Sequence, residues 1–205
     1  MLLLVEMEGA REMSSLEVVR AAYTGRPKDF ITAVDDKNII IVREIKDGEG
    51  YAELMKSAKS MHDMLTGESG AVVKIAMGTI VSEIKDVSRS YKEARMALDV
   101  GKIFYEDRSV VAYSNLGIGR LIYQLPVPLC RMFIKEIFEN KSPEDFDEET
   151  LTTINRFFEN SLNVSETSRQ LYIHRNTLVY RLDKLQRSTG LDLRVFEDAI
   201  TSRSR

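Results

Sequence analysis

The stretch that decides the fold of the C-terminal part is Asn163–Gly190, NVSETSRQLYIHRNTLVYRLDKLQRSTG. Asn163 is a residue type that caps helix N-termini, and Glu166 three positions later completes a capping-box pattern. These two residues predict a short first helix that runs to Leu171. The next three residues, 172–174, leave room only for an abrupt turn. The stretch therefore predicts a helix, a tight turn and a second helix.

The second helix of this stretch carries a single apolar stripe. Its leucines recur at spacings of four and three residues, the period of one helix face; they are Leu178, Leu182 and Leu185. Ile173, the apolar residue of the turn, is expected to fill the angle between the two helices. Gly190 follows the last turn of the pattern, where a left-handed residue ends a helix.

The opposite face of the second helix carries side chains that can hydrogen-bond with DNA. In the major groove, arginine pairs with guanine and asparagine with adenine through two hydrogen bonds each. We expect Arg175 and Asn176 at base edges, with Ser165 and Lys184 on phosphates. Free backbone N–H groups at the start of the first helix, around Thr167, would also face a phosphate. The predicted DNA-contacting residues are Ser165, Thr167, His174, Arg175, Asn176, Thr177, Tyr180, Arg181 and Lys184, of which Thr177, Tyr180 and Arg181 lie in the groove.

Charge along the chain agrees with this interpretation. Residues 163–189 hold five basic side chains and two acidic ones, whereas the whole chain has a formal net charge of −3. The stretch 144–149 holds five acids and no base. A local basic segment in an acidic chain is typical of a nucleic-acid contact. Two alternatives stay open: a hairpin whose polar face is only solvated, and one that binds another protein. For His174 alone, a hydrogen-bonded turn residue is the more ordinary interpretation.

The same stretch resembles the C-terminal helix–turn–helix of the PucR-like regulators, which include the carbohydrate diacid regulators. The shared pattern N-V-S-x-T-x-R-x-L lies at Asn163–Leu171, and an apolar residue with H-R-N-T-L-x-Y-R-L lies at Ile173–Leu182. T-G-L-D-L follows at Thr189–Leu193, and an acidic pair at Glu197–Asp198. Ser168 stands where the family usually has alanine, so a small residue is kept. The resemblance implies a DNA-binding transcription factor.

The first 113 residues alternate strand and helix patterns in the order β-α-β-β-α-β. This order predicts an α+β, ferredoxin-like sheet with helices packed on it. Gly67 and Gly101 are expected to end the second and third helices. The expected strands are Leu2–Glu8, Asp29–Val34, Asn38–Glu44, Ala71–Ile80 and Ser109–Ala112, and the expected helices are Ser14–Tyr23, Tyr51–Leu65 and Val87–Val100.

This half resembles the degenerate GGDEF-like domain of the same regulators. The similarity lies in Met77–Lys102, where S-Y-x-E-A-x-x-A-L occupies Ser90–Leu98. An active diguanylate cyclase would need Gly-Gly-(Asp or Glu)-Glu-Phe on the hairpin that here reads Val34–Asn38, without glycine. The resemblance therefore implies a domain that is not an enzyme. Glu6 and Glu8 share one strand face and form a candidate Mg²⁺ site, with simple solvation at the strand edge as the alternative.

The boundaries expected from these patterns are 1–113 for the degenerate GGDEF-like domain, 114–146 for a helical linker and 147–205 for the helix–turn–helix domain. Two amphipathic helices are expected at Leu116–Leu125 and Val127–Glu139, with a hinge at Lys141–Asp147. The family's N-terminal sugar-diacid-recognition domain has no counterpart here. A small effector, a carbohydrate diacid such as glycerate or glucarate by the resemblance, is therefore expected to act through a domain absent from this chain, which is read as a fragment or a short form.

Composition limits the other classes of protein. The chain has 205 residues, 43% of them hydrophobic, which is ordinary for a globular protein. A single cysteine, Cys130, fits a reducing cytosol, and His62 and His174 are too far apart to suggest a metal or catalytic site. The apolar opening is too short for a signal peptide or membrane span. We expect a cytoplasmic, non-enzymatic regulator without metal or cofactor, bound to double-stranded DNA as a homodimer. A nucleotide cyclase and a protein- or nucleotide-sensing module that does not read DNA are the competing classes.

Overall fold

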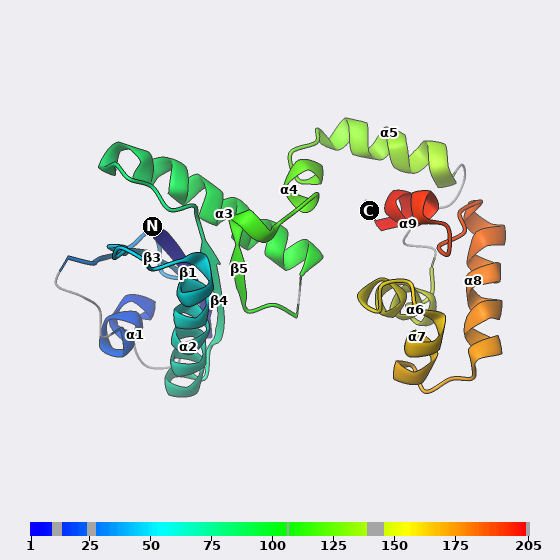
Figure 1. Ribbon diagram of the computed structural model, residues 1–205, viewed down its shortest axis with the longest axis horizontal. Coiled ribbons are helices and arrows are strands. Elements are labelled where there is room, and N and C mark those ends of the chain that lie inside the picture. The colour runs from blue at the N-terminus through cyan, green and yellow to red at the C-terminus, as the bar shows by residue number, and fades with distance from the viewer. Residues whose placement is uncertain (10–13, 24–27, 106, 139–145, 204–205) are drawn as a thin grey trace. The chain divides into compact units, whose positions relative to one another are not determined.

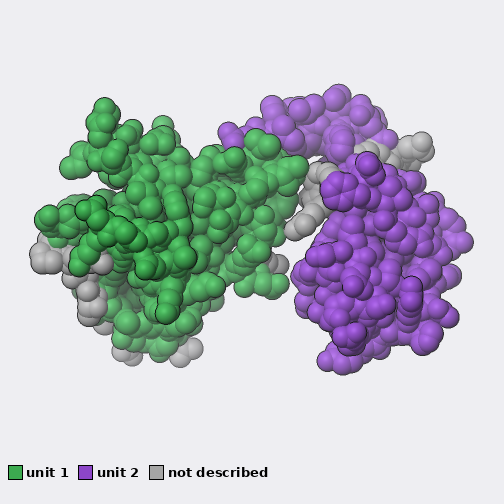
Figure 2. Space-filling view, viewed as in Figure 1, with its two compact units in different colours: residues 1–123 green, residues 124–205 purple. Residues whose placement is uncertain are grey.

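The computed structural model describes residues 1–9, 14–23, 28–105, 107–138 and 146–203. The chain divides into two compact units, residues 1–123 and 124–205 (Figure 2). This division falls inside the stretch 114–146 that the sequence sets apart as a linker. Most of the expected hinge, 141–145, lies outside the described residues.

Unit 1 is built on a five-stranded sheet with the order β2-β3-β1-β4-β5. β1, β2, β3 and β4 are antiparallel neighbours in the order of a ferredoxin-like fold, which confirms the α+β prediction, and β5 adds a parallel edge beside β4. The strands are β1 Leu2–Glu8, β2 Phe30–Ala33, β3 Asn38–Val42, β4 Val72–Met77 and β5 Val110–Ala112.

Helices cover both faces of this sheet (Figure 1). Leu3 and Val5 of β1 pack into one core with α1 and α2, whereas Leu2 and Leu4 pack into a second core with α3. The alternation follows from the two-residue period of a strand, and it explains why β1 is apolar on both faces. The helices are α1 Ser15–Ala22, α2 Tyr51–Ser69, α3 Val87–Phe104 and α4 Gly119–Ile122, with short 3₁₀ turns at Ile84–Asp86 and Tyr113–Asn115.

Two glycines predicted to end helices lie inside them instead. α2 runs through Gly67 and ends at Gly70, whose φ of 63° is left-handed. α3 runs through Gly101, where a Cβ atom would lie 3.0 Å from Val111 Cγ2. Gly101 therefore allows α3 to approach β5 closely, a tertiary requirement that resembles a helix end when only the sequence is read.

Unit 2 consists of five described helices. Its core is formed by Phe157 of α6 and the leucines of α8, together with Leu193. None of the helices in the described part of the chain is long and apolar enough to span a membrane. α4 is much shorter than the expected helix Leu116–Leu125, because it begins only after Gly117, whose φ of 52° is left-handed, and ends at Ile122. The helices of unit 2 are α5 Val127–Phe138, α6 Glu148–Glu159, α7 Val164–Gln170, α8 Arg175–Thr189 and α9 Phe196–Arg203.

Candidate nucleic-acid interface

The predicted pair of helices is present as α7 and α8, joined by a short turn (Figure 1). Asn163 caps α7, and its Oδ1 accepts hydrogen bonds from the backbone N–H groups of Ser165 at 3.0 Å and Glu166 at 3.1 Å. The predicted capping box is wrong in its second half, because the Glu166 carboxylate pairs with Arg169 at 2.8 Å. Thr167 N donates to Asn163 O at 2.9 Å. The prediction of free N–H groups for a phosphate is therefore corrected at both Ser165 and Thr167.

Four residues, 171–174, lie between α7 and α8, and the last three differ in exposure and contacts. Tyr172 adopts a left-handed φ of 54° and its side chain is 96% exposed. Ile173 packs against the core of unit 2, as predicted. His174 caps α8, and its Nδ1 accepts the N–H of Asn176 at 3.2 Å. His174 thus stabilises the start of α8.

α8 buries its leucine stripe and exposes the opposite side. Leu178, Leu182 and Leu185 are buried, and Gly190 ends the helix with a φ of 74°, both as predicted. The predicted contact residues that are exposed are Ser165, His174, Arg175, Asn176, Thr177, Tyr180 and Lys184.

Arg187 is an exposed residue of the same face that the predicted set left out. It follows Tyr180 by seven residues, two helical turns, so it continues the outward stripe that begins at Asn176. The same period that revealed the leucine stripe was sufficient to find it.

Two predicted contact residues have side chains turned into the protein. Thr167 is fully buried in α7, and among the described residues its Oγ1 has no hydrogen-bond partner. Arg181 extends from α8 to α6, where its guanidinium contacts Glu149 Oε1 at 2.5 Å and Thr153 Oγ1 at 3.2 Å. The side chain of Arg181 is only 22% exposed.

In residues 146–201, positive charge without a nearby carboxylate is concentrated on α8. In the described stretch 146–201, four arginines lie within 4.0 Å of a carboxylate: Arg156, Arg169, Arg181 and Arg194. No carboxylate of the described residues lies that close to Arg175, Lys184 or Arg187. Carboxylates therefore pair with the arginines of α6, α7 and the loop after α8, whereas three cations on the exposed face of α8 have no carboxylate this close among the described residues.

The first turn of α6 is acidic and lies beside one flank of α8. Asp147 caps α6 and accepts the N–H of Thr150 at 2.7 Å. The hydrogen bonds from Thr150, with smaller contributions from the charges of Lys184 and Arg181, lower the pKa of Asp147. Asp147, Glu149, Thr177, Arg181 and Lys184 line the same shallow groove. This flank of α8 is therefore less positive than the face that carries Asn176 and Arg187.

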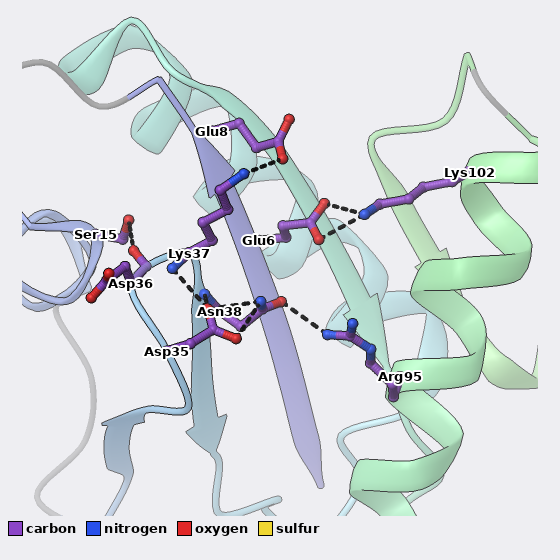
Figure 3. A network of polar contacts seen from close by, with 9 residues as sticks. All are labelled: Glu6, Glu8, Ser15, Asp35, Asp36, Lys37, Asn38, Arg95 and Lys102. Carbon is purple, nitrogen blue, oxygen red and sulfur yellow. Dashed lines mark hydrogen bonds and ion pairs between the residues drawn. The ribbon is translucent and has the colours of Figure 1, made fainter.

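The acids considered for Mg²⁺ in unit 1 hold lysines instead (Figure 3). Glu6 pairs with Lys102 of α3 at 2.6 Å, and Glu8 pairs with Lys37 at 2.9 Å. The hydrogen bond and charge of Lys37 lower the pKa of Glu8. No group of three or more His, Cys, Asp or Glu side chains that could hold a metal occurs in the part of the chain that the structure describes.

The β2–β3 hairpin is tied to α3 by the same network (Figure 3). Asp35 accepts hydrogen bonds at 2.9 Å from both the backbone and the amide side chain of Asn38, and Arg95 of α3 donates to Asn38 Oδ1 at 3.2 Å. The hydrogen bonds from Asn38 lower the pKa of Asp35. Asp35 therefore acts as a turn residue in this hairpin.

Comparisons with known proteins agree with this architecture. Residues 1–100 match the family model of the GGDEF-like domain, and residues 150–202 match that of the PucR C-terminal helix-turn-helix domain. These two domains in this order define the class, a GGDEF-like domain followed by a helix–turn–helix domain. The chain therefore combines a domain of the GGDEF-like family with a domain of the PucR C-terminal helix-turn-helix family.

Curated relatives cover most of the chain. The purine catabolism regulatory protein of Bacillus subtilis is 25% identical over 158 residues, 76% of this chain and 30% of the relative. DNA-binding transcriptional activator AdeR of B. subtilis is 30% identical over 170 residues, 80% of this chain and 40% of the relative. The carbohydrate diacid regulator of Escherichia coli is 25% identical over 203 residues, 92% of this chain and 50% of the relative. The chain thus spans half or less of the length of these relatives.

One solved structure, the regulator of polyketide synthase expression from Bifidobacterium adolescentis, aligns with 99% of this chain and 78% of its own. The TM-score is 0.40 at 14% identity, too low to support a conclusion about this protein.

Proposed function

We propose that this chain is the DNA-binding part of a sequence-specific transcriptional regulator, with α8 as the helix that enters the major groove. The observation that carries the proposal is the charge distribution in residues 146–201. Arg175, Lys184 and Arg187 lie on the exposed face of α8, and no carboxylate of the described residues lies within 4.0 Å of them. A basic, outward helix face behind a short first helix suits a helix–turn–helix contact with a duplex.

The side chains of α8 divide into two roles. Asn176 and Arg175, at the N-terminal turn of α8, reach base edges, where amide and guanidinium groups form paired hydrogen bonds. Tyr180 and Thr177 contribute to the wall of the contact. Lys184 and Arg187, one and two helical turns beyond Tyr180, neutralise phosphates and add affinity that does not depend on sequence.

A selection of bound duplexes from random sequence tests the proposal. Wild-type protein should enrich one operator sequence. Asn176→Ala should then weaken binding to this operator by about 1–3 kcal/mol and relax one base position, because a paired base contact is lost.

Lys184→Ala serves as the matched change on the same helix. It should weaken binding to all duplexes alike and reduce the dependence on salt by about one phosphate contact. Failure to enrich any sequence, with the protein folded, would exclude the proposed function and favour a module that binds protein or nucleotide instead.

We also propose that the protein binds its operator as a homodimer. One helix–turn–helix unit contacts a limited surface, and two half-sites about one helical turn apart are the usual way to reach tight, specific binding.

For the effector, carbohydrate diacids are the first class to test, acting through a part of the regulator outside this chain. The E. coli carbohydrate diacid regulator matches 92% of the chain, more than the 76% and 80% of the two B. subtilis relatives above. Addition of glycerate or glucarate to this chain should leave its affinity for the operator unchanged. Tight binding of either acid in calorimetry would instead make unit 1 the sensor.

The GGDEF-like unit is proposed to be a structural part without cyclase activity. Asp35 and Asn38 form a hydrogen-bonded turn in the hairpin that would approach the nucleotide. The carboxylate of Glu6 forms an ion pair with Lys102. Incubation with GTP and Mg²⁺ should yield no cyclic dinucleotide, and its appearance would overturn this point.

A further inference from the structure

Arg181 of α8 donates hydrogen bonds to Glu149 and Thr153 of α6, and these two residues are also hydrogen-bonded to each other. Its two terminal nitrogens donate to Glu149 Oε1 at 2.5 Å and to Thr153 Oγ1 at 3.2 Å. The Thr153 hydroxyl donates in turn to the Glu149 carbonyl oxygen at 2.8 Å, and Thr153 itself is 2% exposed. Both acceptors therefore lie on α6, the buried Thr153 in its middle and the exposed Glu149 in its first turn.

The contrast with Lys184 shows how the two cations differ. Lys184 lies three residues further along α8, on the same flank, and its side chain is exposed with no carboxylate of the described residues within 4.0 Å. Two of the N–H donors of Arg181 are bonded to Glu149 and Thr153, so its guanidinium is held against α6. The planar guanidinium is suited to holding two acceptors at once, which an ammonium group does less well.

We propose that Arg181 is a positioning residue for DNA recognition. It fixes the angle of α8 on α6 and thereby places Arg175 and Asn176 at the bases, without contacting DNA itself. This inference rests on the proposed function of α8. Glu149 and Thr153 accept the hydrogen bonds that hold Arg181 in this position. Glu149 is part of the bridge although its side chain is 67% exposed.

The competing explanation makes opposite predictions for Glu149. If Arg181 gripped a phosphate in the complex, Glu149 would compete with DNA for it, and removal of the glutamate charge would strengthen binding. If Arg181 positions α8, removal of the same charge weakens sequence-specific binding, because the bridge loses one support.

The test uses the full chain with fluorescence anisotropy on two duplexes of equal length, the operator selected by the wild type and an unrelated sequence, over a series of salt concentrations. The variants are Arg181→Gln, Glu149→Gln, both together, and Arg181→Lys, with Lys184→Gln as the control. Circular dichroism at the assay temperature establishes that each variant is folded. Glu149→Gln changes a largely exposed side chain, so it tests the inference even if Arg181→Gln unfolds.

The positioning role predicts that Arg181→Gln and Glu149→Gln each weaken binding to the operator about tenfold, and that the double variant is no worse than either. Binding to the unrelated duplex and the salt dependence should stay as in the wild type. Arg181→Lys should not restore operator binding. Lys184→Gln should weaken both duplexes and lower the salt slope by about one.

Three results would overturn the inference: tighter operator binding by Glu149→Gln, a salt slope lowered by about one in Arg181→Gln, or full activity of Arg181→Lys. A wild type that prefers no sequence would fail the proposed function itself, and this outcome is distinct from all three.

Discussion

Two buried threonines of unit 2 differ in what their hydroxyl groups do. Thr153 donates to the carbonyl of Glu149 and accepts from Arg181. Thr167 is equally buried, but its Oγ1 has no hydrogen-bond partner among the described residues. The sequence placed Thr167 at the DNA because it stands near the start of α7. It could not show the burial, because that depends on packing against other helices rather than on the residues beside it.

Replacement of these hydroxyls by methyl groups should therefore act in opposite directions. Thr167→Val removes a buried polar group without a partner and keeps the shape, so it should raise the free energy of unfolding of unit 2 by about 1 kcal/mol. Thr153→Val removes one of the two acceptors of Arg181 and should lower the free energy of unfolding by about 1–3 kcal/mol. Urea unfolding followed by circular dichroism measures both, and equal effects of the two changes would contradict the assignment of Thr167.

At the scale of elements, local signals were sufficient for much of the fold. The Asn163 cap and the leucine stripe of α8 were both predicted, because each depends on residues within one or a few turns. Polar contacts between helices that are far apart in the sequence were not predicted. Arg181 meets Glu149 across 32 residues of sequence, and the pair forms only when α6 packs beside α8.

The two glycines near the end of α2 test the corrected helix boundary. Gly67 lies exposed inside the helix with no atom near its missing Cβ, so Gly67→Ala should stabilise unit 1 by about 0.5–1 kcal/mol. Gly70 has a φ of +63°, so Gly70→Ala should cost about 1–2 kcal/mol. Thermal unfolding of both variants decides the boundary, and the reverse order of stabilities would restore Gly67 as the helix end.

The loop between α8 and α9 should make unit 2 sensitive to acid. Asp192 accepts hydrogen bonds from Arg194 at 2.7 and 2.9 Å, and these lower its pKa below the ordinary value of 3.8. A lowered pKa in the folded state gives stability that is present above pH 3.8 and is lost as the pH falls through the folded value. Asp192→Asn should therefore flatten the loss of stability below pH 3.8. An unchanged acid profile in unfolding titrations would show that the pair contributes nothing.

At the scale of the whole molecule, α5 stands out by its uncovered apolar side chains. Within its own unit, Val127, Leu129, Met132 and Phe133 are all exposed. A helix with so wide an apolar surface is normally buried against a partner. We propose a second copy of the chain as this partner, because the operator-bound form is proposed to be two-fold.

Sedimentation should accordingly show a dimer of the wild-type chain at micromolar concentration. Leu129→Asp combined with Met132→Asp should shift the equilibrium toward monomer, because two charges would be buried in the interface. Ile84→Asp, a change at a residue of unit 1 that is 91% exposed, is the control and should leave the dimer intact. A monomeric wild type, free and on operator DNA, would contradict the proposed assembly.

The concentration of unneutralised cations on one face of unit 2 also bears on the time course of binding. A charged face attracts the phosphate backbone over roughly one Debye length, about 10 Å at 0.1 M salt, before any contact is made. In the proposed complex, the paired arginines of α6 and α7 add little to this field, so the attraction should turn α8 toward the duplex during the approach. Encounters then begin in nearly the productive orientation, and added salt should slow the association rate more than it hastens dissociation.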